Sequence, residues 1–152
     1  MKALRIVLPL VLGMSLTTVA PAAVSGGFAC HDINATGLGQ DLGGGHTVAQ
    51  ISDGGLLQGT TTASFTITGF SGTVASFEGT ITFTTNRATL TANVVGTLDI
   101  ATGAFSATGS DLSGTGKLAG ATGSLVFTGV EDLATGAFTE VIGGSICVDL
   151  AP

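Results

Sequence analysis

Residues 77–98, with the sequence FEGTITFTTNRATLTANVVGTL, decide the fold that we expect for this chain. On either side of Asn86-Arg87, apolar or small residues alternate with polar ones, most of which are Thr. A period of two is typical of β-strands with one buried face, and β-branched Thr suits the pleated face that meets water. The residues that share the apolar face are Phe77, Gly79, Ile81 and Phe83, followed by Leu90, Ala92, Val94, Gly96 and Leu98.

The same alternation extends outward along the chain, where Phe65, Ile67 and Gly69 are expected to share a face. No segment after residue 25 has helical periodicity. The pentapeptide ATGAF occurs at 101–105 and 134–138, each time shortly after an aspartate, and predicts tight hairpin loops. Runs of alternation predict eight strands, near 28–37, 46–51, 61–70, 73–85, 88–99, 104–110, 123–132 and 137–149. Eight antiparallel strands with one apolar face can close into a barrel, so we predict an all-β, eight-stranded antiparallel barrel.

The Gly-rich segment 112–125, LSGTGKLAGATGSL, resembles a segment of allene oxide cyclase-like and dirigent-like barrels, and more closely that of uncharacterised secreted bacterial proteins. The order of landmarks is also similar: Ala35-Thr36-Gly37, the strand pair over 77–90, the segment 114–123 and a closing hairpin at 132–136. The resemblance implies an eight-stranded antiparallel barrel. Allene oxide cyclases isomerise a fatty-acid epoxide, and dirigent proteins steer the coupling of phenolic radicals. Neither catalytic set can be placed on this chain, which lacks the Tyr of dirigent-like pockets.

The first 22 residues have the layout of a secretory signal peptide: a basic start, an apolar stretch over 6–20 and small residues at 20–22. The apolar stretch is shorter than the ~20 residues of a membrane-spanning helix. We predict cleavage after Ala22, which leaves one barrel domain over 23–152 that is secreted or periplasmic. That domain would keep two basic residues against ten acidic ones, a net charge of −8.

Composition excludes several classes of partner. A domain with two basic residues has no basic patch for nucleic acid or anionic lipid. A barrel inserted in an outer membrane carries girdles of aromatic residues, whereas this chain has no Trp and no Tyr. We therefore predict neither nucleic-acid binding nor membrane insertion, and the sequence does not indicate an oligomeric state.

The two cysteines lie at opposite ends of the predicted domain. In an oxidising compartment, Cys30 and Cys147 are expected to form a disulfide between the first and last strands. Two alternatives remain open at this point, a reactive thiol at Cys30 beside His31 and a lipid-attachment cysteine at Cys30.

Polar residues do not form a strong cofactor or metal motif. The phosphate-loop pattern fails around Gly116-Lys117, since Asp111 replaces its first Gly and Leu118 its Ser or Thr. The spacings of His31, Asp32, Asp41 and His46 match no metal motif, and these residues are interpreted as surface polar groups. A second acidic set is interpreted as turn formers, namely Asp53, Asp111, Glu131 and Asp132. We predict no cofactor and no metal.

The predicted interior is rich in phenylalanine. The candidates for the barrel lumen, where they would contact an apolar ligand, are Phe65, Phe77, Phe83, Phe127 and Phe138. Glu140 interrupts this apolar pattern, because alternation places it with Phe138 and Ile142. In the lumen its pKa would rise, making it a candidate acid, base or ligand anchor. Alternatively, Thr139 and Val141 face the lumen, or Gly143-Gly144 forms a bulge.

Three functions fit these features. The first is an exported non-enzymatic barrel with a structural role or a role in binding a small apolar ligand. The second is an isomerase or cyclase that uses Glu140 or His31 inside the barrel. The third is surface recognition of carbohydrate, ice or an adhesion partner by the outer Thr rows over 66–68, 80–84 and 89–91.

Overall fold

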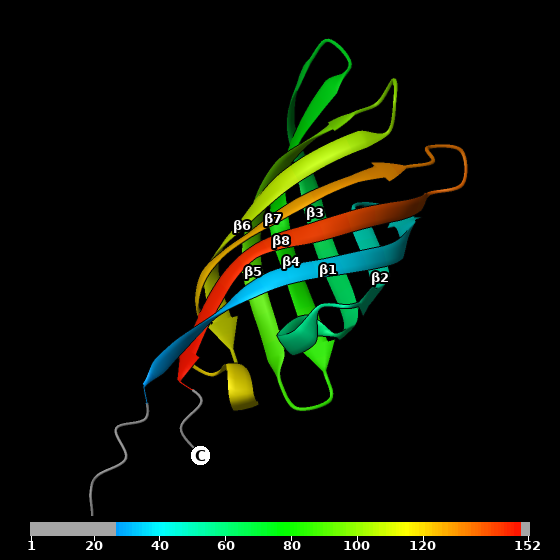
Figure 1. Ribbon diagram of the computed structural model, residues 1–152. Coiled ribbons are helices and arrows are strands. Elements are labelled where there is room, and N and C mark those ends of the chain that lie inside the picture. The colour runs from blue at the N-terminus through cyan, green and yellow to red at the C-terminus, as the bar shows by residue number, and fades with distance from the viewer. Residues whose placement is uncertain (1–26, 150–152) are drawn as a thin grey trace, which may run out of the picture.

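The computed structural model describes residues 27–149, which form a closed barrel of eight antiparallel strands (Figure 1). Each strand pairs with the next one in the chain, and the last strand pairs with the first. The predicted fold class is therefore confirmed, while the predicted signal peptide lies outside the described residues. The strands are β1 (Phe28–Gly43), β2 (His46–Ser52), β3 (Gly59–Ser71), β4 (Val74–Thr85), β5 (Thr89–Asp99), β6 (Ala104–Gly114), β7 (Thr122–Glu131) and β8 (Ala137–Asp149).

The turns after the two aspartates have the same construction. Asp99 and Asp132 each accept a hydrogen bond, through Oδ1, from the backbone N–H two residues later, at 2.9 Å in both turns. Gly103 and Gly136 then adopt φ values of 76° and 74°, in the left-handed region. The repeated ATGAF segment is thus a repeated hairpin turn, as its residue types predict.

The face prediction was wrong at one position on β3. Ile67 pairs with Phe77, but the register shifts before the next pair, Gly69 with Ser76. Ser76 is exposed on the outer face, so Gly69 does not share the face of Phe65 and Ile67. An extra residue in one strand reverses the side-chain parity beyond it, which alternation alone does not reveal.

Two short 3-10 helices close one end of the barrel, which we call the floor end (Figure 1). The helix η1 (Gly55–Leu57) precedes β3, and η2 (Gly116–Leu118) lies within the Gly-rich segment. Leu57 and Leu118 are 0% and 1% exposed, so each helix inserts one leucine into the barrel. The Gly-rich segment therefore builds the floor. Among the described residues, no helix is long and apolar enough to cross a membrane.

The disulfide between Cys30 and Cys147 joins β1 to β8 near the floor end, as predicted. The two cysteines are directly opposite each other in the ladder, although 117 positions separate them in the sequence. Closing a loop of that length restricts the unfolded chain and stabilises the fold by about 5 kcal/mol in the loop-entropy model. Cys30 is therefore neither a free thiol nor available for lipid attachment. Such a disulfide is typical of proteins from an oxidising compartment.

Four phenylalanines each lie against a glycine on the neighbouring strand. A Cβ atom on any of these glycines would collide with the facing ring. The glycines therefore provide the space into which the rings lean. The pairs are Phe65 with Gly79, Phe77 with Gly96, Phe105 with Gly129, and Phe138 with Gly39.

The atoms that an added Cβ would meet differ between these glycines, so alanine substitutions at two of them should differ in their effect on stability. At Gly39 the nearest neighbours of a new Cβ are atoms of the Phe138 ring, which can swing aside, whereas at Gly79 the backbone oxygen of Ser64 blocks the position. We expect Gly79→Ala to lower the free energy of unfolding by about 1–3 kcal/mol more than Gly39→Ala does. Urea denaturation of both variants measures the difference, and equal losses would contradict this account of the pairs.

Candidate functional site

The barrel contains a cavity of about 600 Å³ at the end opposite the floor. Gly44 and Gly45 of the β1–β2 turn line it, so it extends to the end that carries the β1–β2, β3–β4, β5–β6 and β7–β8 turns, which we call the hairpin end. The largest fully buried side chains form a packed core that separates the cavity from the floor. These are Phe83, Ile51, Leu57, Leu90, Leu118, Leu125, Ile142, Ile146 and Val148.

Aromatic rings supply most of the cavity wall. Four of the five predicted lumen phenylalanines line it: Phe65, Phe77, Phe127 and Phe138. Phe83 is fully buried in the core beneath, where its ring stacks on that of Phe127 at 6.3 Å between centroids. Phe105 also lines the cavity and was not predicted. Its place in the second half of an ATGAF repeat, equivalent to Phe138, is the signal that could have identified it.

The rings contact one another in pairs around the wall. The centroids of Phe65 and Phe77 are 5.1 Å apart, and Phe105 meets Phe138 edge to face at 6.0 Å. Such contacts add to the stability gained from burial alone. The wall is therefore held in place by its own ring contacts and by the glycines behind it.

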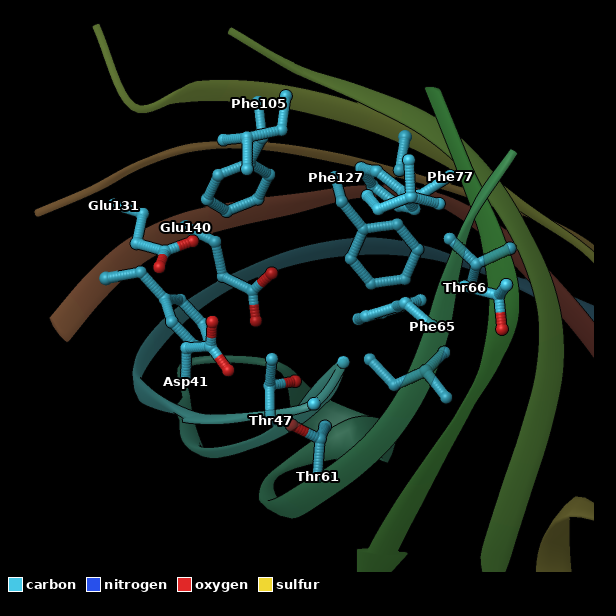
Figure 2. A pocket seen from close by; sticks show the side chains of 18 residues that line it. Asp41, Thr47, Thr61, Phe65, Thr66, Phe77, Phe105, Phe127, Glu131 and Glu140 are labelled. Carbon is cyan, nitrogen blue, oxygen red and sulfur yellow. The ribbon is translucent and has the colours of Figure 1, made fainter. Parts of the chain in front are cut away.

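Glu140 points its carboxylate into this aromatic cavity (Figure 2). The residue is 8% exposed, and its side chain lies over Gly37 of β1, where a Cβ atom would meet its Cγ and Oε1 at 2.6 Å. No described residue forms a hydrogen bond with the carboxylate, and burial raises its pKa to about 7. The pairing of β8 runs without a shift through Gly143-Gly144. Glu140 therefore shares the inner face with Phe138 and Ile142, and the bulge alternative is excluded.

Two further carboxylates line the cavity on the same side, those of Asp41 and Glu131 (Figure 2). Burial, together with the nearby charge of Asp41, raises the pKa of Glu131. Asp41 Oδ1 accepts a hydrogen bond of 2.7 Å from the backbone N–H of Gly43. From the sequence, both residues were interpreted as surface or turn residues, although each is in phase with the inner positions of its strand. Glu131 follows Phe127 and Gly129 at alternate positions, and Asp41 follows Gly37 and Gly39.

The other polar side chains considered in the sequence are dispersed. His31 pairs with Ile146 toward the floor end, whereas Asp41 and His46 flank the β1–β2 turn. Within residues 27–149, no group of three or more His, Cys, Asp or Glu side chains could hold a metal ion. Outer hydroxyls bond one another in several places, including Thr82 with Thr91 at 3.1 Å.

The burial of Glu140 predicts a dependence of stability on pH. Its pKa of about 7 in the folded protein lies above the ordinary value of 4.5 for a glutamate in water. The unfolded chain therefore loses this proton first, and the free energy of unfolding falls as pH rises from about 4.5 to 7, by an amount on the order of 3 kcal/mol. Glu140→Gln should be as stable as the wild type at pH 4.5 and more stable at pH 8.

Urea denaturation of the two proteins across this pH range measures the effect. The difference between them isolates Glu140, because the other shifted carboxyls are common to both. The exposed Glu78, on the outer face of β4, supplies the control variant Glu78→Gln. If Glu140→Gln follows the wild-type pH dependence, Glu140 is not desolvated in the folded protein.

Comparison of the chain with models of protein families, with curated proteins and with solved structures finds no match. The resemblance to allene oxide cyclase-like barrels therefore stays a prediction. The site is an aromatic cavity with three carboxylates, and it lies inside a disulfide-linked barrel that is closed at the floor end.

Proposed function

We propose that this protein is an exported, non-enzymatic barrel that binds a small, largely apolar molecule in its cavity. The observation that carries this proposal is the cavity itself, about 600 Å³ in volume and walled by five phenylalanines. Small-molecule sites typically measure about 300–1,000 Å³ and are mainly apolar with a few polar groups. The disulfide supports export, because it is typical of oxidising compartments.

The two halves of the barrel differ in a way that favours ligand binding over a purely structural role. Small eight-stranded barrels are commonly filled by their own side chains, and the floor half of this barrel is filled. In the half toward the hairpin end, glycines occupy inner positions opposite Phe77, Phe105 and Phe138. Each of these rings leans over its glycine along the wall, which leaves the centre of this half open.

The outer Thr rows support surface recognition less well. Thr82 bonds Thr91, and Thr89 bonds Thr115 at 2.7 Å between their hydroxyl oxygens. Hydroxyls that are already paired across the ladder have less hydrogen-bonding capacity to offer a carbohydrate or ice surface. The cavity is therefore the better supported site.

The chain has no natural Trp, so a single introduced Trp can report on the cavity. Leu98 lines the cavity, and the adjacent Thr97 is exposed on the outer face. We expect the fluorescence of Leu98→Trp to change saturably, with one site per chain, on titration with neutral N-phenyl-1-naphthylamine. Thr97→Trp, the matched control, should show no saturable change. Absence of saturable binding, or equal responses in the two variants, would overturn the proposal.

The raised pKa of Glu140 supports a second candidate function, proton transfer in an isomerase-type reaction inside the cavity. A carboxylate in an apolar site is a stronger base than one in water. The probe 5-nitrobenzisoxazole tests for it: the carboxylate removes the ring C–H proton, the N–O bond breaks as the nitrile forms, and a phenolate is released. The proton then passes from Glu140 to water.

We expect this elimination to accelerate as pH rises through about 7, the pKa of Glu140. Glu140→Gln should lose the acceleration, by roughly 100-fold or more for removal of a general base, while Glu78→Gln retains it. A rate that is equal in wild type and Glu140→Gln, after subtraction of the buffer reaction, would reject this second candidate.

A further inference from the structure

Glu140, like the phenylalanines of the cavity wall, lies over a glycine of the neighbouring strand. Phe138 lies over Gly39 of β1, and two residues further along β8 Glu140 lies over Gly37, where its Oε1 would be 2.6 Å from an added Cβ. Glu140 thus occupies a position equivalent to those of the ring side chains, with a carboxylate in place of a phenyl ring. A phenylalanine or leucine there would satisfy the packing without the cost of desolvating a carboxylate.

The carboxylate of Glu140 is directed at an empty volume and has no partner within the barrel. The residue is 92% buried by area, since 8% is exposed, and no described residue forms a hydrogen bond with its carboxylate. Taking a carboxylate out of water without a compensating hydrogen bond is costly. A ligand that donates hydrogen bonds or carries a positive charge would supply the missing partner.

The other charges around the cavity all have the same sign. Asp41 and Glu131 are the remaining titratable side chains of the lining, and none of the lining residues is basic. Arg87 and Lys117, the basic residues of the described part of the chain, lie in the β4–β5 turn and in η2, both at the floor end. An anionic ligand would meet like charges in the cavity, whereas a cation approaching from the hairpin end would be attracted to it.

The apolar part of the wall also accommodates a cation. Figure 2 shows the rings of Phe65 and Phe127 across the cavity from the Glu140 carboxylate. Aromatic faces attract ammonium groups as well as packing against hydrocarbon. The combination suits a molecule that has an apolar body and one positively charged nitrogen.

We propose that the ligand of this cavity is an organic amine, whose protonated nitrogen pairs with Glu140 and whose apolar body packs among the phenylalanines. This inference rests on the proposed binding function and specifies its ligand class. Asp41 and Glu131 increase the negative potential at the cavity entrance. The group that touches the ligand nitrogen is the Glu140 carboxylate.

The test compares three ligands that share one rigid hydrocarbon cage and differ in one group: 1-adamantylamine, 1-adamantanol and 1-adamantanecarboxylate. Isothermal titration calorimetry on the disulfide-bonded protein at pH 7.5 measures each affinity. We expect the amine to bind roughly 10- to 100-fold more tightly than the alcohol, as for a hydrogen bond to a charged group. The carboxylate should bind most weakly.

Two variants then test whether the preference for the amine over the alcohol depends on the Glu140 side chain. Glu140→Gln should lower the affinity for the amine to about that for the alcohol, because the amide that replaces the carboxylate carries no charge to pair with the ammonium group. Glu78→Gln, on the outer face, should keep the full preference for the amine. Thermal unfolding of both variants checks that they are folded, and binding of the alcohol by Glu140→Gln shows that its cavity is intact.

The outcomes separate the two proposals. If none of the three ligands binds, the proposed binding function is rejected. If the alcohol binds as tightly as the amine, the cavity binds apolar molecules and the amine inference is overturned. If the amine is preferred equally in Glu140→Gln, the pairing with Glu140 is wrong.

Discussion

The structure depends on one steric constraint, the placement of a large inner side chain against a glycine of the adjacent strand. Four rings and Glu140 lie this way, and the pairs span most of the strands around the barrel. Each glycine receives the neighbouring side chain, which therefore leans along the wall and leaves the centre free. Five of the 25 glycines take part in this pairing, namely Gly37, Gly39, Gly79, Gly96 and Gly129.

The fold could be predicted because its main signal is local. Alternation over 77–98 specifies strands, and the aspartate-led ATGAF turns specify where two hairpins reverse. What escaped prediction depends on contacts between strands. The extra residue after Ile67 and the extension of β1 to Gly43 become visible only once β3 and β1 are paired with their neighbours. The pattern of one strand does not show that the strand carries an extra residue relative to its partner.

The sequence predicts which residues of the candidate site face the barrel interior, but not how far along the barrel axis each one lies. Alternation identifies Phe83 and Phe127 as inner residues, yet only the closed barrel shows that the first lies in the packed core and the second lines the cavity. The depth of a residue within a barrel depends on strand tilt and stagger, which the sequence of one strand does not encode. Asp41 and Glu131 lie at strand ends in phase with inner residues, but alternation alone does not show that the barrel brings them together at one side of the cavity.

The covalent link at the β1–β8 seam has a consequence for how the barrel moves. Cys30 and Cys147 tie the seam at the floor end, where the leucines of the two 3-10 helices are also buried. The seam at the hairpin end is held by backbone pairing and by Gln40, whose Nε2 donates a hydrogen bond of 2.6 Å to the backbone oxygen of Thr135. Local opening is least costly where few buried contacts oppose it. The disulfide therefore fixes the β1–β8 pairing covalently at the floor end, whereas toward the hairpin end the same pairing is held by noncovalent contacts alone.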